Sequence, residues 1–344
     1  MPGAITVTFE REPDFFAGMR MAGDEWQVLL AENEDTGELA GMFCRVVQKR
    51  FVNGVPARVA YWGELRIAQS FQGSVFLPRG FALYREVCAK DPVAGNFAVI
   101  ANGNPGAVGV FTQRHWRLLP ALKPIARFNT FGIVLARERK AARRSGGSRL
   151  SIMRTGEFGL EGIVGFLREQ GAGKQLFPVY DERYFRECGL DTDDFIVVAD
   201  ADRIVGVAGL WDQSGCRQTI VHSYNGLLRL ARPLYNLVAP LRGHPLLPGR
   251  GERINSACLS FIAIEEDSIG VFAALLREAC ARAFDRGFDY LMLGLAEADP
   301  LAAAPRALPH VPYTSTLYMV EIDPSLSFAG TLDGRVPYVE ISTL

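Results

Sequence analysis

One order of predicted elements occurs twice along this chain, and this repetition constrains its fold more than any other feature. In each half a β-hairpin leads to a long apolar strand, an irregular loop, a helix and a further strand, as judged from apolar periodicity and turn residues. Two copies of one supersecondary order predict two similar α/β domains, each packing its helix on its own sheet. The predicted elements span residues 28–33, 39–50, 57–67, 78–89 and 97–101 in the first half, and 195–199, 204–211, 258–264, 269–286 and 290–295 in the second.

The size and charge of the chain exclude several classes of protein. Its 344 residues can fill two domains of ordinary size. The net charge of −1 argues against nucleic-acid binding, which needs a basic surface. No apolar run reaches about 18 residues, so we expect no membrane span, and no secretory signal is visible at the start. The six cysteines and four histidines show no metal-ligand spacing, so we expect no metal and free thiols in the cytoplasm.

A basic stretch that turns glycine- and serine-rich, at 137–150, divides the chain. We interpret it as a linker between a first domain at 1–136 and a second at 151–344. The second domain carries an insertion at 222–252, in which Asn225 can cap an amphipathic helix. This helix could cover a hydrophobic substrate, or it could pack against the domain or a partner subunit, so a homodimer stays open. Its apolar residues are Leu227, Leu228, Leu230, Ala231, Leu234, Leu237 and Val238.

The segment after the strand at 97–101 carries a motif. Residues 104–116 read N-P-G-A-V-G-V-F-T-Q-R-H-W, which is similar to the N-x-x-A-x-x-L-Y-x-K-x-G-F of GNAT acyltransferases. The order of strands and helices resembles the same family over roughly 28–135 and, more weakly, 194–323. The resemblance implies an α/β fold of two tandem GNAT-like domains, each a mixed, mostly antiparallel sheet flanked by helices.

The resemblance also implies where an acyl-CoA would bind. In that family the thioester lies in a V-shaped gap between two strands, and its pyrophosphate rests on an R/Q-x-x-G-x-G/A loop that opens the next helix. In the first half Gln72 matches the first motif position, whereas Val75 and Leu77 replace the glycines. The loop of the second half, 265–270, has three acids that would repel pyrophosphate, so the first domain is the expected site. The expected cofactor-binding residues are Ile67, Gln72, Gly73, Ser74, Arg79, Gly80 and Asn104.

Acyl transfer to an amine needs a proton acceptor and a polar group for the charge that develops on the carbonyl oxygen. Glu64, on the central strand, is the expected general base, with an ion pair to Arg66 as its alternative role. Glu297 and Tyr313 are further catalytic candidates, which could equally serve as a surface charge and a packing residue. Phe111 stands where the family often has a tyrosine that protonates the leaving thiolate, and phenylalanine cannot donate a proton.

Together these features predict a CoA-dependent N-acyltransferase. It would move an acyl group from acetyl-CoA or another acyl-CoA to a small-molecule amine or amino-acid-like acceptor. The alternative is a GNAT-like pseudoenzyme that binds a ligand or partner without catalysis, because the phosphate loops of both halves depart from the family pattern. A third hypothesis, an aminoacyl transferase that uses charged tRNA, is disfavoured by the near-neutral charge.

Overall fold

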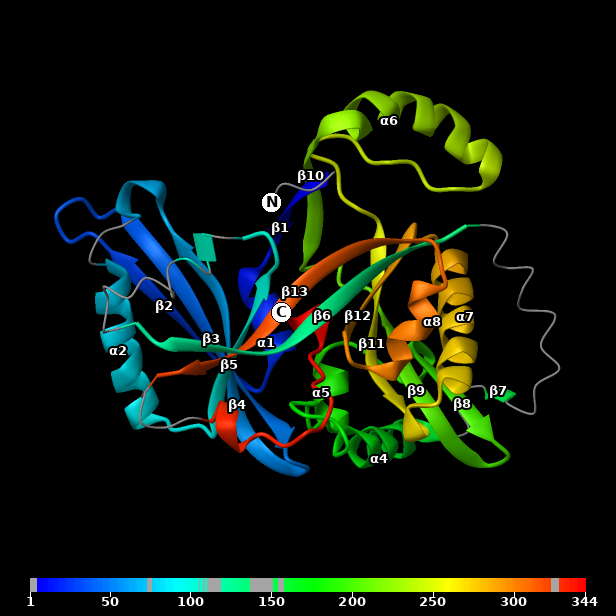
Figure 1. The fold of residues 1–344 in the computed structure, drawn as a ribbon, viewed down its shortest axis with the longest axis horizontal. Coiled ribbons are helices and arrows are strands. Elements are labelled where there is room, and N and C mark those ends of the chain that lie inside the picture. The colour runs from blue at the N-terminus through cyan, green and yellow to red at the C-terminus, as the bar shows by residue number, and fades with distance from the viewer. Residues whose placement is uncertain are drawn as a thin grey trace.

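The computed structural model of the chain describes residues 5–72, 76–104, 106–107, 109, 119–136, 151–153, 158–322 and 328–344 (Figure 1). The strands of the first half are β1 (Ile5–Glu10), β2 (Glu25–Glu32), β3 (Leu39–Val52), β4 (Val55–Ile67), β5 (Gly95–Ala101) and β6 (Ala121–Val134). Those of the second half are β7 (Ser151–Met153), β8 (Phe195–Asp200), β9 (Arg203–Trp211), β10 (Gln218–Tyr224), β11 (Ser256–Ile264), β12 (Tyr290–Ala296) and β13 (His310–Glu321). The helices are α1 (Phe15–Ala22), α2 (Phe76–Lys90), α4 (Gly159–Gly171), α5 (Glu182–Glu187), α6 (Gly226–Val238), α7 (Ile269–Asp285) and α8 (Ala303–Arg306).

Within the described residues the strands form one sheet of eleven strands and a separate pair, β1 with β10. The order across the large sheet is β2-β3-β4-β5-β13-β6-β12-β11-β9-β8-β7. The neighbours β4–β5 and β11–β12 are parallel, and the other neighbours are antiparallel. Strand β13 therefore lies between β5 and β6, and β6 lies beside β12 of the second half (Figure 1). Each half thus completes its part of the sheet with a strand from the other.

The fold class predicted from the sequence is confirmed. A mixed, mostly antiparallel sheet is flanked by helices, and the order β2-β3-β4-α2-β5 recurs as β8-β9-β11-α7-β12. The helices predicted at 78–89 and 269–286 are α2 and α7. The predicted linker at 137–150 lies outside the described residues, so the division into domains at that point stays a prediction.

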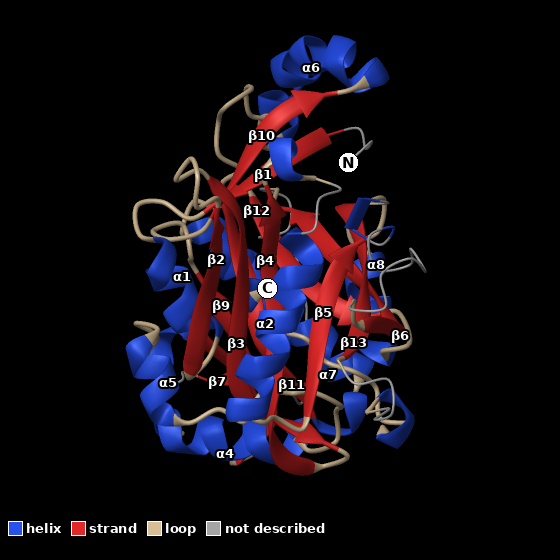
Figure 2. Ribbon diagram, turned by 90° about the vertical axis from the view of Figure 1, so that its left-hand side faces the viewer, coloured by secondary structure: helices blue, strands red, loops and turns tan. Residues whose placement is uncertain are grey.

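Helices α2 and α7 lie against equivalent strands of the two halves. In the first half Figure 2 shows α2 across β3, β4 and β5, where Phe81 stacks on Trp62 of β4 with ring centroids 5.4 Å apart. In the second half α7 packs on the equivalent strands β9, β11 and β12, and also on β8. The core there centres on Phe261 of β11, because five aromatic rings contact its ring. These are Tyr180, Tyr184, Phe185, Phe195 and Trp211.

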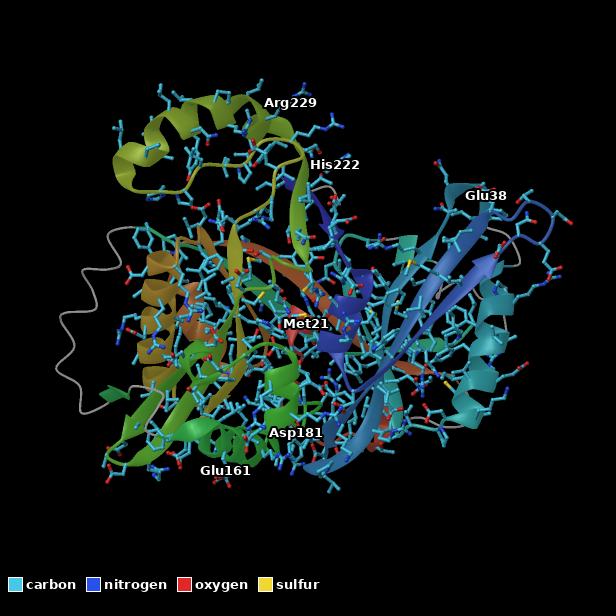
Figure 3. The ribbon with its side chains drawn as sticks, turned by 180° about the vertical axis from the view of Figure 1, so that it is seen from behind. Met21, Glu38, Glu161, Asp181, His222 and Arg229 are labelled. Carbon is cyan, nitrogen blue, oxygen red and sulfur yellow. The ribbon has the colours of Figure 1, made fainter. Side chains whose placement is uncertain are left out.

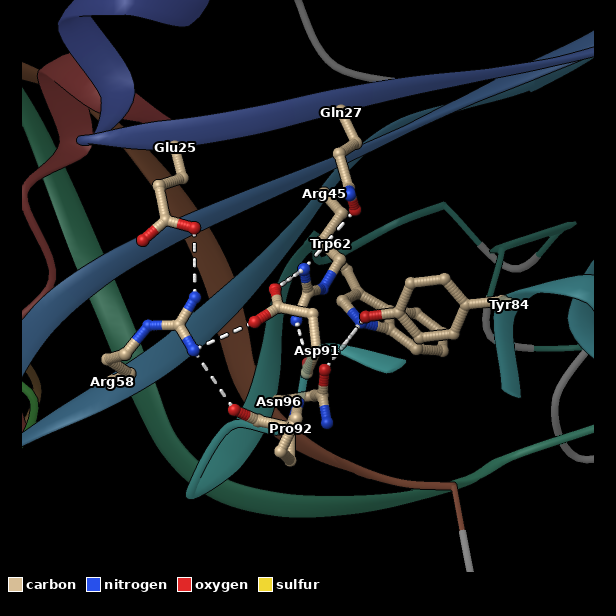
Figure 4. A network of polar contacts seen from close by, with 9 residues as sticks. All are labelled: Glu25, Gln27, Arg45, Arg58, Trp62, Tyr84, Asp91, Pro92 and Asn96. Carbon is tan, nitrogen blue, oxygen red and sulfur yellow. Dashed lines mark hydrogen bonds and ion pairs between the residues drawn. The ribbon is translucent and has the colours of Figure 1, made fainter. Parts of the chain in front are cut away.

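A buried arginine fastens the loop after α2 to the sheet (Figure 4). Arg45 on β3 is 1% exposed, and its guanidinium donates to the Asp91 carboxylate at 2.6 Å and to the Asp91 carbonyl at 2.8 Å. Arg58 on β4 pairs with the same carboxylate at 2.8 Å. Hydrogen bonds from Arg58 and Arg45 hold the pKa of Asp91 below its usual range. One carboxylate therefore joins two neighbouring strands.

Strands β1 and β10, together with the segment from α6 to Arg253, leave the large sheet as a projection that we call the arm (Figures 1 and 2). The arm contains the insertion predicted at 222–252. Asn225 stands at the N-cap of α6, but the predicted capping bond is not formed, and the side-chain amide instead donates to Thr6 of β1 at 3.1 Å. Within the described part of the chain, every helix is too short or too polar to cross a lipid bilayer.

Replacing Asp91 with alanine is expected to lower the free energy of unfolding by about 2 kcal/mol, because the buried Arg45 guanidinium then lacks its counter-ion. The pKa of Asp91 is depressed, so this stabilisation is fully present above the ordinary aspartate pKa. It is lost as the pH falls through the lower folded-state value. Denaturant unfolding across the acidic range measures both effects. Glu187→Ala, which removes the exposed pair with Arg183, is the control, and an equal loss in the two variants would contradict the assignment.

Candidate active site

Both halves carry the same irregularity at the same point of their long strand. On β4 the pairing with β3 admits one extra residue around Glu64 and Leu65, and on β11 the pairing with β9 admits one around Phe261 and Ile262. At each β-bulge one residue has a left-handed backbone, Glu64 with φ 52° and Phe261 with φ 58°. This conformation is uncommon for residues other than glycine and persists where the surrounding structure holds it.

Beside each bulge the two parallel strands stop pairing. Strand β4 pairs with β5 from Val59 to Trp62, although both strands continue beyond. Strand β11 pairs with β12 from Ser256 to Cys258 and then also continues unpaired on that side. Each half therefore has the parted strands that the family resemblance implies for a thioester.

In the second half, residues 338–342 fill the place beside the bulge. The N–H of Phe261 donates to the Glu340 carboxylate at 2.7 Å, and the N–H of Ile262 donates to the Tyr338 hydroxyl at 3.1 Å. Glu340 is buried and also accepts from the hydroxyl of Tyr338 at 2.7 Å. The main-chain N–H groups that would bind a thioester carbonyl are thus already bound to the side chains of Tyr338 and Glu340. We call these two side chains the plug.

A cavity of about 170 Å³ lies next to this filled gap. Its lining holds three carboxylates, those of Glu266, Asp267 and Asp299, against the single ammonium of Lys174. Lys174 bridges Asp267 at 2.7 Å and Asp299 at 3.0 Å, so its charge is already used. Ser268 caps the first turn of α7. Excess negative charge and a capped helix start both oppose a pyrophosphate here.

In the first half, charged side chains surround the bulge. The Glu64 carboxylate pairs with Arg11 and, at 2.8 Å, with Arg66, so the ion pair considered from the sequence is present. Burial opposes the ionisation of Glu64, but Arg11, Arg66 and Arg217 together hold its pKa below the usual range. Burial and the charge of Arg11 lower the pKa of Arg217 to about 10. Arg11 and Arg217 both donate to the main-chain carbonyl of Leu344.

Within the described ranges, the bulge of the first half has no equivalent of the plug formed by Glu340. Among the described residues, no side chain accepts a hydrogen bond from the N–H of Glu64 or Leu65. The two arginines beside this bulge come from the base of the arm, since Arg11 follows β1 and Arg217 precedes β10. The two bulges share a backbone and differ in what surrounds it.

The start of α2 differs in charge from the start of α7. Its first turn has no acidic residue, and Arg79 and Gly80 are exposed there. A Cβ built on Gly80 would meet no atom within 4 Å. Gln72 is exposed and donates to the carbonyl of Ile67 at 3.4 Å, while Asn104 caps the turn after β5. Gly73, Ser74, Val75 and Phe111, which were singled out from the sequence, lie outside the described part of the chain, as does most of the motif at 104–116.

The three predicted catalytic residues are not brought together. Strands β5, β13 and β6 lie between Glu64 on β4 and Glu297, which follows β12. Glu297 is half-exposed and lies 3.5 Å from Arg127. Tyr313 lies on β13 opposite Thr130 of β6, where burial raises its pKa. Glu64 is the one of the three that lies at a bulge.

The sequence analysis did not identify four residues that lie beside the bulges. They are Arg11, Arg217, Tyr338 and Glu340. The run P-Y-V-E-I-S at 337–342 alternates as a strand does, which is a weak signal for an extended segment. No pattern marks the two arginines, because they are brought to β4 by the pairing of β1 with β10.

Comparisons with known proteins show the fold. No family model matches the chain, and no curated protein matches its sequence. A GCN5-related N-acetyltransferase from Sphaerobacter thermophilus aligns with 92% of this chain and 84% of its own length, with a TM-score of 0.52 and 15% identity. Saccharomyces cerevisiae N-myristoyltransferase with bound myristoyl-CoA aligns with 98% of this chain and 91% of its own, with a TM-score of 0.51 and 7% identity. A GCN5-related glucosamine N-acetyltransferase region of a fungal multi-domain GH3 β-N-acetylglucosaminidase reaches a TM-score of 0.58 at 10% identity, over 92% of this chain and 38% of that one. The chain is a GNAT-fold protein over nearly its whole length.

Replacing Glu340 with alanine is expected to lower the free energy of unfolding by about 3 kcal/mol, because the Phe261 N–H and the Tyr338 hydroxyl lose their buried acceptor. Denaturant unfolding at neutral pH measures the change. Glu297→Ala is the matched control, since that carboxylate is half-exposed and should contribute little. An equal free energy of unfolding in the two variants would show that the buried contacts of Glu340 do not stabilise the second half.

Proposed function

We propose that this protein is a CoA-dependent N-acyltransferase. It binds acetyl-CoA or another acyl-CoA between β4 and β5 and transfers the acyl group to a small amine or amino-acid-like acceptor. One observation carries the proposal: the first half has a bulge and parted strands at Glu64 without the plug that Glu340 forms at Phe261. The fold agrees with a thioester substrate, since structures that share it are named N-acetyltransferases and N-myristoyltransferase.

The charge at the two helix starts favours the first half for the pyrophosphate. A helix N-terminus carries partial positive charge and free N–H groups, which attract anions. At α2 no acid opposes this attraction and Arg79 adds to it. At α7 the acidic loop with Asp267 stands in the same place, and Lys174 is already paired.

The chemistry needs few side chains. The amine nitrogen attacks the carbonyl carbon of the thioester, the carbon–sulfur bond breaks, and the amine loses a proton as the thiolate leaves. Main-chain N–H groups at the bulge would stabilise the charge on the carbonyl oxygen. Glu64 is the candidate for the group that holds the amine and accepts its proton. Because its pKa is lowered, Glu64 is ionised at neutral pH and can accept a proton, as a weak base, once the exposed Arg66 moves aside.

Isothermal titration calorimetry against acetyl-CoA and a long-chain acyl-CoA tests the location of the thioester. We expect Arg79→Ala to weaken binding about tenfold, because it removes a charge-assisted hydrogen bond to phosphate. Arg85→Ala, further along the same helix, is the matched control and should leave binding unchanged. Binding that survives Arg79→Ala but is lost in Lys174→Ala would place the thioester in the second half instead.

An acyl-transfer assay tests the role of Glu64. Glu64→Gln is expected to lower kcat about a hundredfold, whereas Glu297→Gln should leave kcat unchanged. Since the pKa of Glu64 is lowered, protonation of Glu64 should reduce the wild-type rate only below the ordinary titration range of a glutamate. Binding of acyl-CoA without transfer to any of a broad set of amines would favour the pseudoenzyme alternative, which the departures in the phosphate loop support.

A further inference from the structure

The arm carries a helix, α6, whose apolar face is exposed to solvent instead of packed against the protein. On α6 and the turn after it, leucines recur at intervals of three and four residues and are between 66% and 86% exposed. The arm stands clear of the sheet, as the positions of His222 and Arg229 in Figure 3 show. The exposed set is Leu227, Leu230, Leu234, Leu237 and Leu241.

The opposite face of α6 makes the polar contacts of the arm. Asn236 bonds to both the carbonyl and the N–H of Leu247, at 3.0 and 2.9 Å, and Arg232 donates to the same carbonyl at 3.1 Å. The guanidinium of Arg232 also lies over the ring of Tyr224, 5.5 Å from its centroid. The hydrogen-bonding side of α6 thus faces the rest of the arm, and the leucine side is exposed and available to a partner. A contiguous apolar patch of this kind marks an interaction site.

The charge of the arm identifies the kind of partner. From residue 222 to 251 the sequence has four arginines and no aspartate or glutamate. The arginines are Arg229, Arg232, Arg242 and Arg250. The rest of the arm adds Glu10, Glu252 and Arg253, so the arm is net positive although the whole chain carries a net charge of −1. A helix with an apolar stripe and basic neighbours is typical of segments that lie in the plane of an anionic lipid surface.

A second copy of the chain fits this surface less well. The helix is about 20 Å long and one face is about 10 Å wide, so the patch offers roughly 200 Å², whereas a stable interface buries about 800 Å² per partner. A twofold contact would also bring two basic tips together. The leucine spacing covers about two heptads, fewer than the three or four that a coiled coil needs.

We propose that the arm docks the protein on anionic lipid bilayers, with the five leucines inserted at the boundary between headgroups and acyl chains. The proposal rests on the arm alone and does not depend on the acyltransferase assignment. The arginines supply the attraction to the surface and the leucines supply the apolar contact, so binding requires both.

Flotation of the whole protein with vesicles tests this proposal. We expect binding to phosphatidylcholine vesicles that contain phosphatidylglycerol, little binding to phosphatidylcholine alone, and weaker binding at high salt. Leu230→Gln combined with Leu234→Gln should reduce binding by at least about tenfold, and Arg229→Gln by about fivefold. Leu30→Gln combined with Leu39→Gln, at exposed leucines of the first half, is the matched control and should bind as the unmodified protein does.

Sedimentation velocity on the same proteins tests whether a second copy of the chain, instead of a lipid surface, covers the leucine patch. A dimer that dissociates in the Leu230→Gln, Leu234→Gln variant, with no vesicle binding, would assign the patch to a second copy and overturn the proposal. Equal binding to neutral and anionic vesicles would overturn the role of the arginines. A monomer that floats with neither kind of vesicle would reject the lipid surface altogether.

Discussion

Strand β13 is the constraint on which the rest of the structure depends. It pairs along its length with β6 and, on its other edge, with β5, so that a strand near the end of the chain closes the sheet of the first half. Strand β6 in turn leaves the first half and pairs with β12. Neither half can satisfy the hydrogen bonds of its central strands without the other, because an unpaired buried strand edge is costly. The chain that follows β13 then brings residues 338–342 to the bulge of the second half.

The same kind of β-bulge occurs in both halves, in different surroundings. Both bulges hold a residue in the left-handed region, but Phe261 is at the centre of an aromatic core while Glu64 is ionised among arginines. At Phe261 the free N–H is bound by Glu340, so the strain is absorbed into a closed and stable half. At Glu64 the same geometry is kept with charged neighbours and without the plug. Strained backbone that is not used for packing is most easily explained by a ligand, which is the basis for placing the thioester there.

The sequence predicted the repeated elements because their signals are local. Apolar alternation and helix periodicity over 39–50, 57–67 and 269–286 depend on near neighbours, and the structure confirms them. The acids at 265–267 predict a half that rejects phosphate, and this stays a prediction. The exchange of β6 and β13 could not be predicted, because it pairs segments nearly two hundred residues apart through main-chain bonds that carry no side-chain signature. The bulge at Glu64 was equally hidden, since glutamate gives no sign of a left-handed backbone. The cap expected from Asn225 failed because a tertiary partner, Thr6, binds its side chain instead.

The arm and the bulge of the first half share a base. Arg11 follows β1 and Arg217 precedes β10, so the two strands that carry α6 are continuous with the two arginines that contact Glu64 or Leu344. These contacts require β1 and β10 to hold their register, since a shift of one residue would turn each arginine to the other side of its strand. The exposed leucines at the tip of the arm and the ionised Glu64 at its base are thus connected through one pair of strands, β1 and β10.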